Sequence, residues 1–510
     1  MCRAGTGSGP HALGSGWLGR LGQVRLLLVS TYELGHQPLQ IATAAAELAA
    51  AGHEVRCWDV AVQQWDQEAW DLVSQSDGVA FSVPMHTAMR LGLSLAKDIH
   101  TRHPDLPLCL YGIYAAAAKS ASDAAGVETL IAGEYSEGLL RWADSLSLAK
   151  RPPGSVTIST SPRRGKKPAL PARHLLPPLD RYATMRFGAR DHLVGYVEAS
   201  RGCRHHCRHC PIPAVYDGRT QISRVDELLA DVESLVAAGA SHISFGDPDF
   251  FNGPAHACRV VEALHGSFPS LTFDCTIKVE HILKERRRIP ALAKAGCLFV
   301  VSALESAHDP TLVRLAKDHT VADAAAAASI LAEAGIDMRP SWLPFTPWTT
   351  ASHLADMMDF VAANNLADST DLVQYSIRLL LPDGAALLDD PIVADSITGY
   401  DAEALGWRWA SPDPEMDRLA ASLAALAEEA ASCGSDLAEA WEQVRSRIAE
   451  AAGRPDSGKA AGLRFRDEEQ IPHMTEAWFC CAEPTQDQRS LLATRAASAP
   501  GCGPMLRECA

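Results

Sequence analysis

Three cysteines in one short segment have the residue type and the spacing of a metal-cluster site. Cys203, Cys207 and Cys210 follow directly after a short strand pattern at residues 196–198. Three thiolates at this spacing can bind three irons of a four-iron cluster and leave the fourth iron without a protein ligand. A structural zinc site is the alternative, because a histidine of the same segment could complete four ligands: His205, His206 or His209. All three thiols lie on one loop rather than in two distant Cys-x-x-Cys pairs, which favours the iron-sulfur cluster.

The composition is that of a globular protein in a reducing compartment. The 510 residues carry a net charge of −16, and 47% of them are hydrophobic against 21% charged, which excludes a disordered chain. The acidic balance argues against a nucleic-acid partner bound through its phosphates. Fourteen cysteines are too few for a disulfide-dense scaffold, no apolar run of 18 residues is present, and residues 1–23 lack the apolar core of a signal peptide. We therefore expect a cytoplasmic protein with neither a nucleic-acid nor a membrane partner.

Two successive alternations of strands and helices must position the thiols. The first, over residues 24–150, predicts an α/β domain with a doubly wound parallel sheet, preceded by a disordered tail at residues 1–23. Ligands of such sheets bind at the carboxyl ends of the strands, here near residues 31–37, 84–87 and 112–115. Residues 151–185, which begin with a basic stretch rich in Pro, Ser and Gly, are expected to form a linker.

The second alternation, over residues 186–390, predicts a partial parallel (β/α)6 barrel with its chemistry at the carboxyl ends of the strands. Its strand patterns are residues 196–198, 242–245, 272–276, 298–303, 337–343 and 372–380. Ala- and Glu-rich patterns then predict a helical region at residues 391–452, and residues 453–510 form a linker and a cysteine-containing tail.

The CxxxCxxC loop after the first strand of a partial barrel resembles the defining motif of the radical SAM superfamily. The resemblance implies that Cys203, Cys207 and Cys210 bind a [4Fe-4S] cluster and that S-adenosylmethionine (SAM) chelates the open iron. Reductive cleavage of SAM would then give a radical that acts on a small-molecule substrate. It also implies an electron donor such as flavodoxin or ferredoxin.

The same resemblance suggests contacts to SAM. Gly246, Asp247 and Asp249, in the run Gly-Asp-Pro-Asp after the second strand, stand where the family places its motif for the methionine amino group. The run departs from the family's Gly-Gly-Glu, but a carboxylate suits an ammonium. Glu305, after the fourth strand, resembles the acid that meets the ribose; its alternative is a surface acid at a strand end. Two fifth-strand residues are candidates for the SAM carboxylate or ribose: Arg339 and Ser341.

The N-terminal domain resembles the cobalamin-binding domain that precedes the barrel in a large radical SAM subgroup. The similar segments are residues 37–56 and residues 133–138 (GEYSEG). The Asp-x-His-x-x-Gly pattern that supplies the lower histidine ligand is missing, and residues 33–36 stand in its place with His36 as their histidine. Subgroup members include proteins that bind cobalamin without this ligand and proteins that bind none. With cobalamin the enzyme would transfer a methyl group to an unactivated centre; without it, a radical from SAM would react with the substrate directly.

An adjacent thiol pair, Cys480 and Cys481, stands in a Cys-Cys-Ala-Glu-Pro run near the C-terminus. This run resembles the CUAEP/CCAEP-tail family of radical SAM proteins, some of which carry selenocysteine at the second position. We expect an exposed, catalytic pair of soft ligands, and hence a thiophilic substrate containing selenium or arsenic. A third thiol could come from Cys433, Cys502 or Cys509. The alternatives are a pair buried for packing, a redox or sulfur relay, and an anchor for an auxiliary cluster.

The sequence thus predicts a radical SAM enzyme that modifies either a thiophilic substrate, containing selenium or arsenic, or another small molecule. Two enzyme mechanisms stay open, direct radical attack and cobalamin-dependent methyl transfer. A non-catalytic iron-sulfur binding or sensor protein, and a zinc-stabilised adaptor, are the alternatives outside enzymes.

Overall fold

The computed structural model describes residues 22–148, 155–159, 169–433, 435–454 and 465–476. The predicted N-terminal tail lies almost wholly outside these residues. Cys480 and Cys481 also lie outside the described residues. No helix in the described part is long and apolar enough to cross a membrane.

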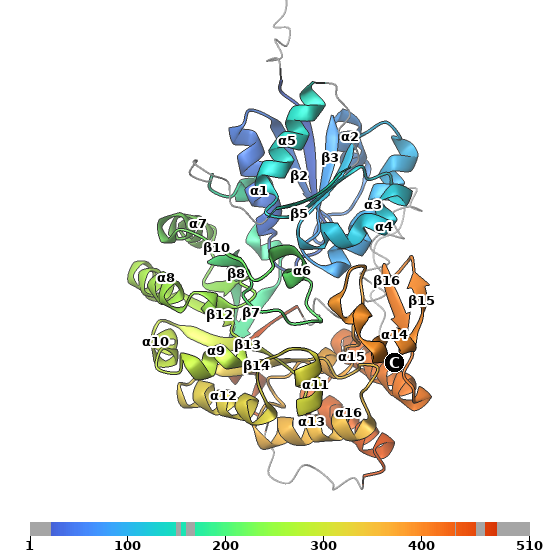
Figure 1. The fold of residues 1–510 in the computed structure, drawn as a ribbon. Coiled ribbons are helices and arrows are strands. Elements are labelled where there is room, and N and C mark those ends of the chain that lie inside the picture. The colour runs from blue at the N-terminus through green and yellow to red at the C-terminus, as the bar shows by residue number, and fades with distance from the viewer. Residues whose placement is uncertain (1–21, 149–154, 160–168, 434, 455–464, 477–510) are drawn as a thin grey trace, which may run out of the picture.

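The N-terminal domain is a parallel sheet with helices on both faces, as predicted. Its strand order is β2-β1-β3-β4-β5-β6, and its main elements are β1 (Arg25–Ser30), α1 (Leu39–Ala50), β2 (Glu54–Asp59), α2 (Gln67–Gln75), β3 (Gly78–Ser82), α3 (His86–Arg102), β4 (Leu108–Tyr111), β5 (Thr129–Gly133), α5 (Ser136–Ser147) and β6 (Ser155–Ser159). Strands β3, β4 and β5 are buried along their whole length, because helices cover both faces of the sheet (Figure 1). Chain order reverses between β1 and β3, which is where such sheets bind ligands.

The segment predicted as a linker contributes structure to both domains. Strand β6 pairs in parallel with β5 and extends the first sheet. The following described residues include a 3-10 turn at Arg173–Leu175, and Ala172 N donates to Ala42 O of α1 at 2.9 Å. The chain therefore contacts the first domain at β6 and again at Ala172, before it enters the second domain.

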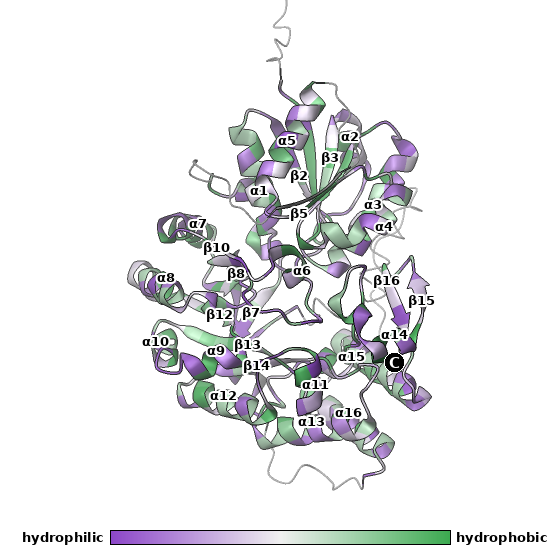
Figure 2. Ribbon diagram, viewed as in Figure 1, coloured by the Kyte–Doolittle hydropathy of each residue, from purple (hydrophilic) through white to green (hydrophobic). Residues whose placement is uncertain are grey.

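The second domain is an open, curled sheet that corresponds to the predicted partial barrel. The strand order is β14-β13-β12-β11-β8-β7-β17, with β7 (Thr184–Phe187), β8 (Arg190–Val197), β11 (His242–Phe245), β12 (Thr272–Thr276), β13 (Cys297–Glu305), β14 (Asp337–Trp342) and β17 (His473–Met474). Five strands, β8 and β11 to β14, are parallel, and β7 and β17 add antiparallel pairs at one edge. The outer face is covered by α7 (Val225–Ala237), α8 (Pro254–Ser267), α9 (Val279–Lys284), α10 (Ile289–Lys294), α12 (Val321–Glu333) and α13 (Ala351–Ala363). In Figure 2 these helices show both colours, as expected of helices that bury one side against a sheet.

Two expectations for the C-terminal half were wrong in detail. The predicted sixth strand, residues 372–380, begins as a 3-10 helix at Leu372–Tyr375 and joins the sheet only through a bridge between Phe345 and Arg378. The region expected to be helical contains α14 (Pro391–Ser396), α15 (Pro414–Cys433) and α16 (Leu437–Ala451), but also an antiparallel hairpin of β15 (Ile397–Asp401) and β16 (Gly406–Trp409). This hairpin contacts the N-terminal domain, where Arg90 Nε donates to Glu403 O at 3.2 Å.

Arg173 forms a buried clamp between the two domains. Its Nε and Nη2 atoms donate to the two oxygens of Asp231 on α7, at 2.7 and 2.8 Å. Nη2 also donates to Tyr196 O of β8 at 2.7 Å, and Nη1 donates to Gln37 Oε1 of the first domain at 3.1 Å. A guanidinium can make all of these bonds at once because its donors form a fixed planar fork.

Replacing Arg173 by Ala should destabilise the protein strongly, because Asp231 would keep a buried charge without a partner. We expect a loss of about 3–5 kcal/mol in equilibrium urea unfolding. The matched control is Arg224→Ala, which removes an equally bidentate but exposed pair with Asp226 and should change the unfolding midpoint little. An Arg173→Ala variant as stable as the control would show that the clamp does not hold the domains.

Candidate functional site

The three predicted cluster ligands lie on one loop at the carboxyl end of the first barrel strand. The loop begins after β9 (Ser200–Gly202), which pairs with β10 (Thr220–Ile222), and ends at α6 (Ile212–Tyr216). Gly202 turns the chain into the loop with φ +76°, and a Cβ there would lie 2.4 Å from Arg219 O, so only glycine fits. Two backbone amides fix the loop to the barrel: Arg204 N donates to Asn252 Oδ1 at 3.1 Å, and Arg208 N donates to Leu315 O at 3.0 Å.

The thiols suit a cluster better than a single zinc ion. Burial raises the pKa of Cys203, and it raises the pKa of Cys210 to about 12, so metal binding must displace their protons. One zinc ion at about 2.3 Å from each sulfur would hold three Sγ atoms roughly 3.8 Å apart. A four-iron cluster instead takes each thiolate on a different iron, which suits three cysteines spaced along one loop.

A buried ion-pair group supports the loop from the end of β13. Glu305 Oε1 lies 3.2 Å from Lys317 Nζ and 3.1 Å from His209 Nε2 of the cluster loop. Burial alone would raise the pKa of Glu305, but the ammonium and the imidazole beside it lower the pKa to about 2. Lys317 stays charged because Glu305 and the thiols of Cys207 and Cys210 oppose the effect of burial on its pKa. The ammonium of Lys317 therefore places a permanent positive charge beside the thiols. The predicted contact of Glu305 with the ribose of SAM stays a prediction.

The Gly-Asp-Pro-Asp run lies at the end of β11, as predicted, and both of its acids bind groups of the chain itself. A Cβ at Gly246 would lie 2.0 Å from Tyr196 Oη, so the glycine makes room for that ring. Asp247 accepts from Ala199 N at 2.8 Å and Ser200 Oγ at 2.6 Å, and burial raises its pKa to about 7. Asp249 accepts from Phe251 N at 3.1 Å and lies between two histidines. Contacts of these acids with SAM remain predictions.

The two fifth-strand candidates lie in different surroundings. Arg339 forms an ion pair with Asp371 and donates to Pro472 O at 3.2 Å, so it fastens the C-terminal segment to the sheet. Ser341 is buried two residues further along β14. Among the described contacts, Arg339 bonds to the C-terminal segment and not to the cluster loop.

A cavity of about 350 Å³ lies where the first domain meets the second domain and the end of the described chain. It is lined from the first domain by the loop after β1, including Thr31, Tyr32 and Gly35, and by the residues after β2. Tyr182, at the start of the second domain, also lines it and donates to Asp59 Oδ2 at 2.9 Å. The last described residues, Thr475 and Glu476, complete the lining. The predicted ligand loop at residues 31–37 thus borders a cavity.

Charged residues join the two domains beside the cluster loop. Glu134, in the predicted turn after β5, accepts from Tyr216 Oη at 2.9 Å and lies 3.4 Å from Arg201 of β9. Arg201 also lies 3.7 Å from Glu198, whose pKa burial raises to about 7. The turn that resembled a cobalamin-binding domain therefore contacts the hairpin that carries the cluster loop.

His36 of the first domain reaches the second domain. Its ring stacks on Tyr196 with 4.7 Å between centroids, and its Nδ1 atom is buried without a hydrogen-bond partner in the described structure. Burial lowers the pKa of His36 to about 4, so the ring is neutral at neutral pH.

Sequence reasoning named His209 only as a possible zinc ligand and missed three other residues around the loop. Lys317 and Lys278 stand close to the thiols or their loop, and His281 lies on α9. The only sequence signal was the presence of histidines inside the CxxxCxxC motif, since the lysines belong to other strand-helix units.

Comparison with known proteins finds one family model that matches within the barrel. Residues 197–360 match the family model described as the Radical SAM superfamily. No curated protein matches the chain.

Solved structures share the arrangement of both domains. A structure of the radical SAM methyltransferase TsrM from Kitasatospora setae, with tryptophan substrate and aza-SAM bound, is 16% identical with a TM-score of 0.59, and covers 79% of this chain and 88% of its own. A TsrM structure with cobalamin and a [4Fe-4S] cluster is 15% identical with a TM-score of 0.59, covering 84% and 99%. The cobalamin-dependent SAM radical enzyme OxsB, with aqua-cobalamin and SAM bound, is 14% identical with a TM-score of 0.62, covering 81% and 67%. At these identities the likeness concerns the fold.

Replacing Lys317 by Met should lower the reduction potential of a cluster on the loop, because reduction adds negative charge and a neighbouring cation favours it. The double variant Lys317→Met/Glu305→Gln removes one charge of each sign and should return the potential towards the wild-type value. Redox titration followed by electron paramagnetic resonance (EPR) measures the potentials of both variants. Lys284→Met, at an exposed residue of α9, is the control. Equal potentials in wild type and Lys317→Met would contradict the electrostatic role of Lys317.

Proposed function

We propose that the protein is a cobalamin-dependent radical SAM enzyme that transfers a methyl group to a small-molecule substrate. Residues 197–360, which match the Radical SAM superfamily model, support the radical SAM part of this proposal. Cobalamin-dependent methyl transfer was one of the two mechanisms left open by the sequence, and the comparisons favour it over direct attack by a SAM-derived radical. The observation that carries the proposal is the shared arrangement of both domains with TsrM and OxsB, whose structures hold cobalamin. These relatives also favour an enzyme over the non-catalytic alternatives.

A radical SAM enzyme uses a [4Fe-4S] cluster to donate one electron to SAM. In this chain, Cys203, Cys207 and Cys210 would hold the cluster, and Lys317 would offset the charge of the thiolates. The backbone amides of Arg204 and Arg208 fix the position of this half-buried loop against the barrel. Asp247 connects the same loop region to the end of β11, where we propose that SAM binds through its methionine end.

The residues of the first domain fit a large polar ligand such as cobalamin. Buried polar atoms without a hydrogen-bond partner in the described structure occur after β1, at Glu33 Oε1 and His36 Nδ1, and after β3, at Thr87 Oγ1. The amide groups around a corrin ring could satisfy such atoms, which otherwise cost free energy when buried. They lie at the switch point of the sheet, and the loop after β1 also lines the interdomain cavity.

We propose that cobalamin binds here without a histidine below the cobalt. His36 is the histidine of the first loop, but its ring stacks on Tyr196 of the barrel. A ring held in this way cannot also swing to the face of the first domain. The chain's own contribution would then be to bind the corrin by its edges and leave the lower face without a nitrogen ligand.

Anaerobic reconstitution with iron, sulfide and hydroxocobalamin tests this function. We expect about one cobalt and four irons per chain, and SAM turnover with reductant that releases S-adenosylhomocysteine or 5′-deoxyadenosine. The EPR spectrum of the Co(II) form should show no nitrogen splitting and should be the same in His36→Gln. The Cys203→Ala variant should lose iron and turnover but retain cobalt. Iron without cobalt would restore direct radical attack as the function, and nitrogen splitting that disappears in His36→Gln would assign His36 as the ligand.

A specific observation keeps a thiophilic substrate as a second candidate. Thr475 and Glu476 line the interdomain cavity, and Cys480 stands four residues further along the chain. Four residues span at most about 14 Å, so a cavity lined by Glu476 is within that chain length of Cys480 in the sequence. Two adjacent thiols suit arsenic or selenium centres.

Arsenite binding measures this second candidate. The wild-type chain should retain a stoichiometric amount of arsenite after desalting, and Cys480→Ser/Cys481→Ser should retain at least about tenfold less. The double variant should keep its iron and cobalt content. Cys258→Ser is the control for a free thiol elsewhere. Equal arsenite retention in the double variant would remove the proposed role of the tail pair.

A further inference from the structure

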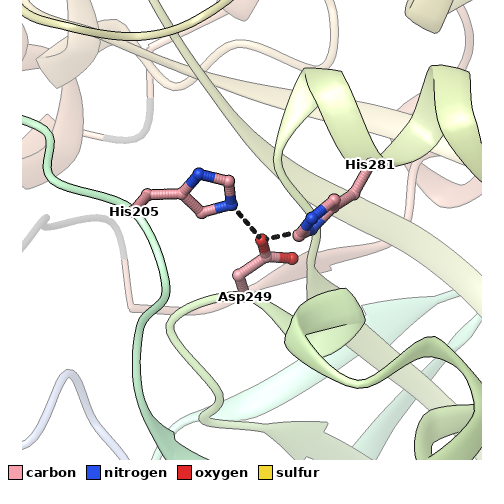
Figure 3. A group of neighbouring side chains, drawn as sticks. All are labelled: His205, Asp249 and His281. Atoms are coloured by element: carbon pink, nitrogen blue, oxygen red, sulfur yellow. Dashed lines mark ion pairs between the residues drawn. The ribbon is translucent and has the colours of Figure 1, made fainter. Parts of the chain in front are cut away.

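Three potential metal ligands converge next to the cluster loop (Figure 3). Asp249 Oδ2 lies 3.4 Å from His205 Nε2 and 2.6 Å from His281 Nδ1. All three ligand atoms lie within 4.8 Å of one another. The two imidazole rings face each other with centroids 4.9 Å apart and planes tilted by 57°.

The convergence is not explained by hydrogen bonds. Each of the three facing atoms, His205 Nε2, Asp249 Oδ2 and His281 Nδ1, is buried and has no hydrogen-bond partner of suitable direction in the described structure. The short distances are those of ion pairs. Buried polar atoms normally have a partner, and three that point at one position without one indicate a missing ligand.

We propose that His205, Asp249 and His281 bind a divalent transition-metal ion, iron(II) or zinc(II), in addition to the metals of the cluster and cobalamin. Two imidazoles and one carboxylate form a donor set that both ions use, and it leaves coordination positions open. Each ligand comes from a different element: the cluster loop, the end of β11 and helix α9. The proposal gives Asp249 to this ion rather than to the amino group of SAM.

The neighbouring charges favour a cation. Glu280 and Asp318 lie with Asp249 around His205, and Lys278 Nζ lies 3.9 Å from Glu280 and 3.7 Å from Asp318. Lys284 also pairs with Glu280, so three carboxylates face two ammonium groups, and a cation would offset the remaining negative charge. This balance applies to the described side chains around His205.

The Nδ1 atom of His205 has a hydrogen-bond partner both without and with an ion at Nε2. Lys278 Nζ lies 2.9 Å from His205 Nδ1, and an ammonium can only donate, so without an ion Nδ1 accepts and Nε2 carries the proton. An ion at Nε2 moves the proton to Nδ1, where Glu280 Oε2 at 3.7 Å can approach to accept it. Lys278 can then turn to Asp318. A carboxylate behind a metal-binding imidazole is a common feature of metal sites.

An ion at this site would attach the cluster loop to the barrel at a further point. His205 stands between Cys203 and Cys207, so an ion on His205 would tie the middle of the loop to β11 and α9. Open coordination positions at the carboxyl ends of the barrel strands would accept an oxygen or nitrogen ligand of a small molecule. The site does not depend on cobalamin, and it stands if the proposed methyl transfer is wrong.

Metal counting tests the site separately from the cluster. The full chain carrying Cys480→Ser/Cys481→Ser, to remove the tail thiols, is reconstituted with its cluster, passed over a chelating resin and titrated with zinc. We expect about one zinc per chain in addition to four irons. His281→Gln and His205→Gln should weaken zinc binding by more than about tenfold while the iron count stays the same. His206→Gln, in the same loop but exposed, is the matched control and should bind zinc normally.

A charge substitution separates an ion site from a hydrogen-bonded triad. His281→Glu places a second carboxylate beside Asp249, so without zinc it should melt at a lower temperature than His281→Gln. With zinc, the glutamate can act as a ligand and the melting temperature should rise, whereas His281→Gln should not respond. A chain that binds no zinc beyond its cluster irons, or a His281→Gln variant that binds zinc like the wild type, would overturn the proposal. A His205→Gln variant that loses iron but binds zinc like the wild type would overturn it as well.

Discussion

The position of the candidate site depends on the buried guanidinium of Arg173. It joins Gln37 of the first domain, Asp231 of α7 and the backbone of β8 at Tyr196. Burying such a pair costs solvation free energy, so it contributes more to the relative position of the domains than to stability. Tyr196 is also the ring on which His36 stacks. The same few bonds therefore fix the distance between the first-domain loop and the strand that leads to the cluster loop.

Buried lysines stand beside the thiols although the chain as a whole is acidic. The protein carries −16 overall, but two buried lysines, Lys278 and Lys317, stand next to the cysteine loop. Each is held by carboxylates that are themselves satisfied, as Glu305 is by Lys317 and His209. A cluster with thiolate ligands is negative, and these cations compensate it without making the whole surface basic. The overall composition therefore argued against a nucleic-acid partner but carried no information on the electrostatics of the site.

The sequence was sufficient to predict those parts of the structure that depend on local patterns. Strands such as β3 and β4 are continuous apolar runs, because both faces of the sheet are covered, and the cysteine spacing is local as well. The sixth barrel strand was mispredicted because its apolar residues bury against the C-terminal helices: Trp441 Nε1 of α16 donates to Tyr375 Oη at 3.0 Å. The partners of Asp249 were not predictable, since His205 and His281 come from separate elements and meet only in the folded chain.

The pairing of β17 with β7 has a consequence for the order in which the protein is made. Thr475 bonds to Thr184, 291 residues earlier in the chain, and contacts of such separation form late. The N-terminal domain and the parallel strands leave the ribosome well before residues 471–476, and domains fold as units during synthesis. The edge strand β7 therefore has no partner on that side until residues 471–476 have been synthesised. During that interval the cavity also lacks the wall formed by Thr475 and Glu476.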